Sequence, residues 1–593
     1  QAYNPYAFFD SRNPKQTRQQ LNGSIYLDWN VFKGFTAHVD YALSFSNYFQ
    51  KRADTPTGAA YDFQTGKDIG RYYVADNVGV SDNNTTNYKT QLNGRLQYET
   101  TIAQNHNIGA MFVYSEEYWH TRSTGASRND RIHPSTSEIN SALTNVQSNS
   151  GSSASEGLRS YIGRMNYSAY DKYLLEFSFR VDGSSKFIKG HQYGFFPTVA
   201  VGWRFTEEEF LKKYLSSWLS SGKLRASWGK LGDNSGVGRF EQLETLTAMN
   251  YMSSDVVKGF VNKKMINKDL SWEVSTDINV GLDLGFLNNR LRTEIDFYNR
   301  LRTGMNRPSQ MSIHLTGAYS APRANIGDLL NRGLELNLTW KDKIGNVEYS
   351  VNLNGAYNRT VLKEWNEFLS RGWVYLDMPY HFLYVYENNG IAQTWQDIYN
   401  NTPQGLSPGD VIRKDLNGDG IIDGKDKKAY PNIQRDRPTT TYGITLQAAW
   451  KGFDISMLFN GGLGRKDFWL TDFNNTAFAD RRYASTWDHW TEPWSLENRG
   501  GEWPRLGTST DRSDNSYWLY NMNYLRMKNI MLGYNLPKKL LSKISMTNLR
   551  IYASAENLFT VTQYPGLDPE KKNSARDLYP INRSFSIGLN VSF

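Results

Sequence analysis

The last ten residues of the chain read Ser584-Phe-Ser-Ile-Gly-Leu-Asn-Val-Ser-Phe593, and polar and apolar side chains alternate without interruption. Successive side chains of a β-strand point to opposite faces, so this strand has one apolar face and one polar face. A half-buried strand of a soluble sheet has the same alternation. Because the pattern recurs along the whole chain, and the chain stops on an aromatic residue at a strand end, it indicates a transmembrane β-barrel.

The alternation is clearest where charged residues share a strand with aromatic ones. In segment 173–181 every odd position is aromatic or aliphatic, whereas Glu176 and Arg180 lie on the opposite face. Lipid outside the barrel and water inside it explain both faces. The same pattern predicts strands at 199–205, 278–284, 334–340, 442–450 and 453–459.

Composition excludes a helical membrane protein. The mean hydropathy is −0.62, and no uninterrupted apolar run reaches the roughly 18 residues that a spanning helix needs. Aromatic residues make up 14% of the chain, as expected where rings anchor at lipid boundaries. The chain has no cysteine, so neither disulfides nor an acyl anchor on Cys is expected. The net charge of +8 is small for 593 residues, so we expect no nucleic-acid partner and place Lys and Arg at the barrel rim, facing lipids of the outer membrane.

The spacing of turns predicts the topology. Short turns or compact connections are expected at 30–34, 104–107, 170–173, 206–223, 287–290, 341–346, 451–452 and 537–547, with a short amphipathic helix in 206–223 and in 537–547. Long polar segments alternate with them, at 47–87, 119–155, 361–438 and 465–516. Short turns face the periplasm in such barrels and long loops face outward. Eight hairpins and the last strand give an all-β, antiparallel barrel segment of about seventeen strands.

The start of the chain leads to a further expectation. The first predicted strand, about 21–30, runs into a short turn, so residues 1–20 are expected in an extracellular loop. Bacterial barrels of this type have an even strand count and begin in the periplasm. Residues 1–10 have neither the basic start nor the apolar core of a signal peptide. We therefore expect an upstream segment, removed or travelling as a separate chain, that carries the remaining strands and whatever fills the lumen.

Several stretches resemble one known family. They are 170–187, 195–205, 224–232 and 548–559, and the most specific are Gly-Trp-Arg-Phe-Thr-Glu at 202–207 and Tyr-Pro-Gly-Leu-Asp-Pro-Glu at 564–570. Together they resemble SusC-like TonB-dependent outer-membrane transporters, over essentially all of residues 1–593.

The resemblance implies a 22-stranded barrel in the cell outer membrane. It also implies an N-terminal plug, a periplasmic TonB contact that supplies energy, and a SusD-like surface lipoprotein that closes over the mouth as a lid. The chain departs from the family in one respect: its sequence does not include the plug or the TonB-contact segment. Members often form dimers of barrel and lid units, and whether this chain does so stays open.

One segment has the spacing of a calcium loop. Calcium prefers six or more hard oxygen ligands, and residues 415–426 place oxygens at loop positions 1, 3, 5, 9 and 12, with Gly at position 6. The alternative is an Asn/Asp/Gly turn without metal. Five positions in register favour a structural calcium ion that stiffens the loop 361–438, although Asp stands at position 12 where Glu is usual. The expected ligands are Asp415, Asn417, Asp419, the carbonyl of Ile421, Asp423 and Asp426.

The loop that starts at residue 465 is rich in tryptophan. Its six members are Trp469, Trp487, Trp490, Trp494, Trp503 and Trp518. Flat aromatic faces beside hydrogen-bonding groups can stack on sugar rings or hold an aromatic peptide. The alternative, which we weigh more heavily, is that these rings pack the loop against itself or dock the lid.

The sequence contains no nucleophile elbow, phosphate loop or zinc-protease motif, so we do not expect an enzyme. The expected function is TonB-dependent active import of a bulky nutrient, an oligosaccharide rather than a peptide, together with the lid lipoprotein. A passive porin or a structural outer-membrane barrel is the alternative, and the porin requires an open lumen without a plug.

Overall fold

The structure is a computed structural model. It describes the chain except for residues 1–9, 12–13, 56, 63–64, 74–78, 132, 134, 143–146, 216–217, 253–255, 263, 312–313, 315–320, 368–374, 381, 469–491, 502, 506–513, 542–545, 567, 572–580 and 593.

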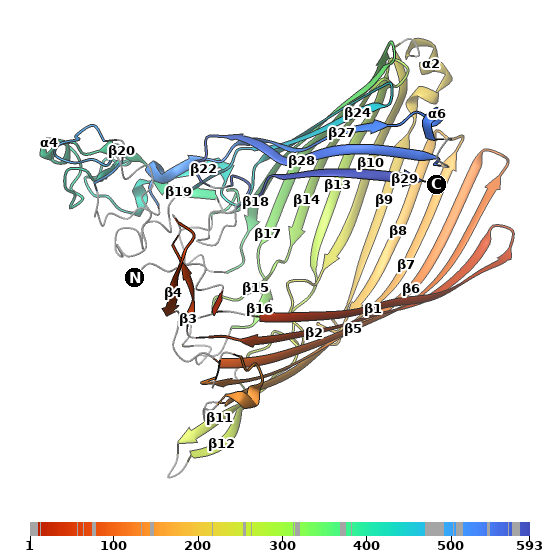
Figure 1. Ribbon diagram of the computed structural model, residues 1–593. Coiled ribbons are helices and arrows are strands. Elements are labelled where there is room, and N and C mark those ends of the chain that lie inside the picture. Colours follow the sequence, from red (N-terminus) through yellow and green to blue (C-terminus); the bar gives the residue numbers. More distant parts are fainter. Residues whose placement is uncertain are drawn as a thin grey trace. The chain divides into compact units, whose positions relative to one another are not determined.

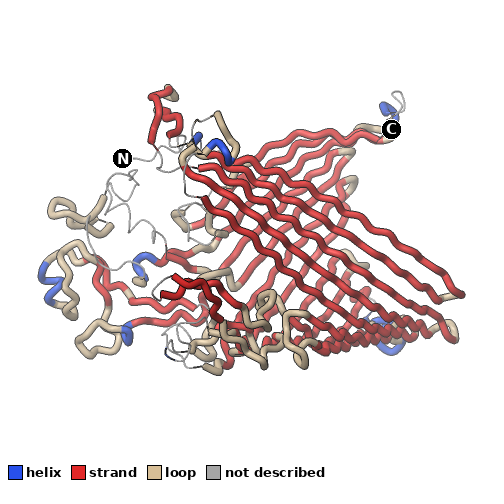
Figure 2. The backbone as a smooth tube through the Cα atoms, turned by 90° about the horizontal axis from the view of Figure 1, so that it is seen from below, coloured by secondary structure: helices blue, strands red, loops and turns tan. Residues whose placement is uncertain are grey.

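Strands dominate the described chain, as Figure 2 shows by their red colour. Seventeen of them form one sheet, and all the pairings given below are antiparallel, which confirms the predicted fold class and strand count. They are β1 (Pro14–Phe32), β2 (Phe35–Ala53), β5 (Gly79–Ile102), β6 (His106–Asn129), β7 (Gln147–Ala169), β8 (Tyr173–Ser184), β9 (Tyr193–Trp203), β10 (Leu219–Asp233), β13 (Glu273–Phe286), β14 (Leu291–Thr303), β17 (Asp328–Ile344), β18 (Val347–Glu364), β23 (Thr440–Trp450), β24 (Phe453–Leu463), β27 (Tyr524–Asn535), β28 (Asn548–Thr562) and β29 (Ser584–Ser592).

The chain forms two compact units. The first comprises residues 1–200, 229–275 and 303–326, and the second 201–228, 276–302 and 327–593. In the first unit strands pair in the order β1, β2, β5, β6, β7, β8. In the second the order is β14, β17, β18, β23, β24, β27, β28, β29. Figure 1 shows both series as meanders in which neighbours in sequence are neighbours in the sheet.

The register gathers the apolar side chains on one face, which we call the outward face. On β17, Leu336 pairs with Ile295 of β14, and Leu338 pairs with Leu353 of β18. On β29 the side chains of Phe585 and Ile587 are exposed on the same kind of face. The opposite, inner face carries the polar residues of each strand. A wall that is apolar on one side and polar on the other confirms strands that separate lipid from water.

The short turns lie where the sequence predicts them. β7 and β8 are joined through Tyr170 and Asp171, and β13 and β14 through Leu287 to Asn289, all with positive φ. The compact connections at 206–223 and 537–547 hold the helices α2 (Glu209–Leu215) and α6 (Lys538–Leu541), as predicted. None of the described helices is long and apolar enough to cross a membrane.

Several strands extend further than predicted. β1 begins at Pro14, so the assignment of residues 14–20 to a loop is wrong. β2 and β5 extend into the predicted loop 47–87, and β6 and β7 into the predicted loop 119–155. Water bathes both faces beyond the membrane, so these polar strand ends have no alternation to reveal them, whereas their backbone hydrogen bonds continue.

The remaining elements are short. The small sheets pair β3 (Thr57–Tyr61) with β4 (Asp68–Tyr73), β11 (Leu246–Met252) with β12 (Val256–Asn262), β15 (Asn306–Pro308) with β16 (Arg323–Asn325), β19 (Phe382–Tyr386) with β22 (Lys427–Gln434), β20 (Asn388–Ile391) with β21 (Val411–Arg413), and β25 (Lys466–Phe468) with β26 (Leu519–Asn521). The other helical segments are α4 (Trp395–Tyr399), η1 (Ile139–Ser141), η2 (Phe205–Glu207), η3 (Gly424–Asp426) and η5 (Ser516–Trp518).

Two of the long loops fold together. Leu383 and Val385 of β19 share one hydrophobic core with Phe468 and Trp518, which belong to the next long loop. We call the described residues of 375–438 and 465–521 the two-loop module. Its core shows that these loops are packed structures and not loose connections.

Candidate functional site

The inner wall of the second unit carries a run of neutral hydrogen-bonding groups. The Asn352 amide on β18 donates to Asn337 Oδ1 at 2.7 Å and to Thr339 Oγ1 at 2.8 Å, both on β17. Ser350 donates to Gln447 Oε1 on β23 at 3.1 Å. Such a wall offers donors and acceptors in pairs, which suits hydroxyl-rich or amide-rich molecules.

Several charged residues of the inner wall are held in ion pairs. Arg225 of β10 donates to Asp283 of β13 at 2.9 Å, and to both oxygens of Asp296 of β14 at 2.7 and 2.6 Å. In the first unit, Lys89 lies 2.8 Å from Glu117. Paired charges fix the orientation of the wall and leave little net charge on it.

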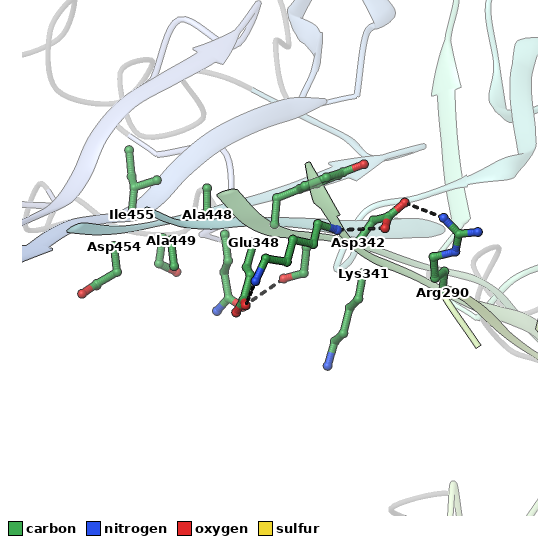
Figure 3. Close-up of a pocket in the computed structure, with 13 residues that line it drawn as sticks. Arg290, Lys341, Asp342, Glu348, Ala448, Ala449, Asp454 and Ile455 are labelled. Atoms are coloured by element: carbon green, nitrogen blue, oxygen red, sulfur yellow. Dashed lines mark hydrogen bonds and ion pairs between the residues drawn. The ribbon is translucent and has the colours of Figure 1, made fainter. Parts of the chain in front are cut away.

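A depression of about 670 Å³ lies near the short turns of β17, β18, β23 and β24. Arg290 and Asp342 form an ion pair at 3.1 Å at its edge, and in Figure 3 the side chain of Lys341 extends away from that pair. Ser350 and Gln447 also line it. The depression therefore combines neutral polar groups with one cation that has no carboxylate partner among the described residues.

The predicted calcium loop has the backbone that such a loop requires. Gly418 and Gly420 have φ of +74° and +79°, a region that disfavours side chains. Asp415 accepts hydrogen bonds from the amides of Gly418 at 2.7 Å and Gly420 at 2.9 Å. Asp426 is fully buried and accepts from the amides of Leu416 and Asp423, at 2.9 and 2.8 Å.

The carboxylates of this loop are turned mainly to backbone amides. The pKa of Asp415 is lowered, because desolvation by burial, which raises it, is outweighed by hydrogen bonds from Gly420, Gly418 and Thr402 and by the Asp426 side chain beside it. No group of three His, Cys, Asp or Glu side chains in the described part of the chain is placed to hold a metal ion. The predicted ligands are therefore not gathered around one point in this structure, and calcium binding by the loop stays a prediction.

The tryptophans of the second loop differ in burial. Trp494 and Trp518 are 7% and 6% exposed, and Trp503 is partly buried against the same core as Trp518. Trp494 Nε1 donates to Gln393 Oε1 at 3.0 Å, which ties the two loops together. These three rings lie as expected if the loop packs on itself. Trp469, Trp487 and Trp490 lie outside the described residues.

A buried arginine that the sequence did not single out joins three loop segments. The Arg465 side chain is 1% exposed and donates to the carbonyls of Arg435, Pro569 and Lys571 at 3.0 Å and of Glu570 at 3.1 Å. No local pattern marks it, because its partners lie up to 106 positions away.

A second buried arginine holds the Tyr564–Glu570 motif to the wall. Arg526 of β27 is 3% exposed, lies 2.8 Å from Asp568 and forms an ion pair with Glu570. Tyr524 and Asn460 also donate to Glu570, at 3.0 and 2.9 Å. The most specific stretch of the sequence is thus a structural clamp between the last long loop and the strands below it.

Comparison with known proteins agrees with this architecture. A family model described as TonB dependent receptor-like, beta-barrel matches residues 1–405. The chain is 28% identical over 612 residues to the TonB-dependent receptor SusC of Bacteroides thetaiotaomicron, covering 100% of this chain and 57% of that protein. It is 28% identical over 620 residues to the TonB-dependent receptor P3 of Formosa agariphila, covering 93% and 59%.

Solved structures show the same fold. The RagAB peptide importer in the open-open state superposes with a TM-score of 0.83 at 22% identity, over 99% of this chain and 62% of that chain. The structure of the RagAB peptide transporter gives a TM-score of 0.82. The chain spans about three fifths of the length of these relatives.

Proposed function

Since the chain belongs to the TonB-dependent receptor-like β-barrel family, we propose that it is the barrel wall of an active importer for a bulky nutrient. The observation that carries the proposal is an outer-membrane β-sheet with an apolar outward face and a hydrogen-bonding inner face. Such a wall guides cargo and performs no bond chemistry. Energy would come from TonB, through a plug-bearing part of the protein outside this sequence.

An oligosaccharide is the cargo we favour. Neutral pairs such as Asn352 with Asn337, and Ser350 with Gln447, match the dense hydroxyl groups of a sugar. The charge of Arg225 is already satisfied by two carboxylates, so this residue offers no free charge to peptide termini. A peptide is the second candidate.

A SusD-like lipoprotein is the partner we propose for the extracellular side. The two-loop module is a folded surface, and a rigid surface loses less conformational entropy when a lid docks on it than loose loops would. Direct contact of the tryptophans with lid or cargo stays a prediction, with Trp503 the most exposed of the described three. Pairing of two barrel and lid units stays open.

Calcium is part of the proposal. Asp415, Asn417, Asp419, Asp423, Asp426 and the carbonyl of Ile421 would hold one ion, which would supply positive charge between the carboxylates and fix the loop. Tyr384 of β19 donates to the carbonyl of Gly424 at 3.0 Å, so a stiffer loop also steadies the module. Terbium luminescence of the purified protein tests this: D415N should abolish a calcium-competed signal. An unchanged signal in D415N would contradict the proposal that residues 415–426 bind calcium.

The transport proposal is tested in cells. A strain that lacks this protein should lose growth on the relevant glycan, and loss of TonB should have the same effect while growth on a small sugar is retained. Uptake that persists without TonB would favour the passive porin. A structural barrel would leave growth unchanged in both strains.

A further inference from the structure

Two arginines oppose each other on the outward face of β17 and β18. Arg332 is the register partner of Arg359, and Asn299 of β14 is the partner of Arg332 on its other side. Leu334 and Leu336 lie on the same face of β17, since residues two apart share a face. Figure 1 shows β14, β17 and β18 as adjacent strands.

Neither arginine has a carboxylate partner among the described residues. The Arg332 Nε donates to Asn299 Oδ1 at 2.6 Å, and the Arg359 Nε is buried without a hydrogen-bond partner. Like charges placed directly opposite each other across two strands are destabilising. An arginine elsewhere on an outward face is arranged differently, because Arg159 lies 3.0 Å from Glu116. The Arg332 and Arg359 pair therefore lacks its own counter-charge.

The position of the pair relative to the membrane identifies the missing anion. Below it lie the exposed side chains of Leu334 and Tyr357, and at the short-turn end of the same strand lies Trp340. A tilted strand rises about 2.6 Å per residue, so Arg332 lies roughly 21 Å above Trp340. The apolar band of such barrels is about 25 Å tall. The two guanidinium groups therefore lie near the outer boundary of that band, at the level of lipid headgroups.

We propose that Arg332 and Arg359, with the side chain of Asn299 beside them, bind a phosphate group of a lipid in the outer leaflet. A guanidinium presents a planar pair of donors that matches two phosphate oxygens, and two of them facing one phosphate satisfy both charges. The site concerns the membrane and not the cargo, so it stands apart from the proposed transport.

The proposal is tested with the full-length protein in nanodiscs. The probes are phosphatidylcholine discs that contain either diphosphoryl lipid A or its dephosphorylated form, and the measurement is the melting temperature during titration of the lipid. The wild-type protein should be stabilised by the diphosphoryl form alone. In the R332Q/R359Q double variant the apparent affinity should fall at least about tenfold, because two charge-assisted contacts are lost.

Matched variants separate binding from general effects. R292Q removes an exposed arginine from the inner face of the same group of strands and should leave the titration unchanged. If the double variant does not fold, as judged by heat-dependent migration in gels, R332Q and R359Q are titrated singly, and each should weaken the stabilisation. Equal stabilisation of wild type and variants would overturn the proposal. So would an equal response to both lipids, or full stabilisation by inorganic phosphate in detergent.

Discussion

Replacement of Arg465 by Met should separate the loop segments that it joins without unfolding the barrel wall. The substitution keeps an unbranched apolar stem in a site that is 1% exposed, and it removes every donor of the guanidinium. Four carbonyl groups, those of Arg435, Pro569, Glu570 and Lys571, then lose their partner.

The size of the effect follows from the number of lost bonds. A buried polar group left unsatisfied costs about 1–3 kcal/mol, so four carbonyls give a gross cost of about 4–12 kcal/mol. Removing a buried charge returns part of this, and water reaches the carbonyls once the segments separate. We expect a net local loss of about 3–5 kcal/mol, the usual range for breaking a buried ionic site. A loss of 3 kcal/mol raises the local opening equilibrium roughly 150-fold.

Hydrogen exchange followed by mass spectrometry measures this opening. Amides of the described residues near 434–436 and 564–571 should lose about two orders of magnitude of protection, while those of β17 and β18 stay unchanged. R164Q is the control, since Arg164 and Glu176 form an ion pair at 2.7 Å in which the two side chains are 45% and 37% exposed, and its loss should cost about 1 kcal/mol or less. Protection that is equal in R465M and the wild type would refute the view that this arginine joins the segments. Loss throughout the barrel would refute the view that the effect is local.

Three other substitutions or conditions probe the wall and the loops. R225M should lower the melting temperature, because Asp283 and Asp296 lose their shared partner. R225K should lower it less, since a lysine replaces the charge but not the planar donors. Equal melting temperatures of the wild type, R225M and R225K would contradict this. The pKa of Glu570 is lowered, since desolvation, which raises it, is outweighed by Arg526 and by the hydrogen bond from Tyr524. Its stabilisation is therefore complete above the ordinary value of about 4.3 and is lost as pH falls through the lower folded value, so exchange near 568–571 should rise only in acid. G409V should destabilise the two-loop module by about 2–4 kcal/mol, because Gly409 has φ of +93° and an added Cβ would lie 2.4 Å from the Trp494 ring. Tryptophan fluorescence during denaturation measures this loss of stability. Unchanged stability would show that the Trp494 ring moves aside at no cost.

The barrel strands were predictable because lipid imposes a two-residue period on them. The alternation in 584–593 and in 334–340 identified β29 and β17, with Leu334 and Leu336 on the correct face. Beyond the lipid the alternation of polar and apolar side chains stops. The sequence therefore predicted loops for the ends of β5, β6 and β7 that extend past it. Backbone pairing continues there without any sequence signal.

The packing of the loops and the roles of the buried arginines were harder to predict from the sequence, for a different reason. The burial of Trp518 depends on Leu383, more than 130 residues earlier, and the role of Arg465 depends on carbonyls of residues 569–571. No local pattern encodes such distances. The opposition of Arg332 and Arg359 likewise appears only when the register of β17 and β18 is known. The ligand spacing of 415–426, by contrast, is local and was read directly, and the binding of calcium there stays a prediction.

The Arg465 junction has a consequence for the order in which the protein is made. Its acceptors at 569–571 are synthesised more than a hundred residues after the arginine, and Arg435 precedes it by 30. The junction cannot close until residues 569–571 have been made and brought beside the arginine. Contacts between such distant segments form late, since the chain between them must first be ordered. Closure of the Arg465 junction is therefore expected to be a late step in the folding of this protein.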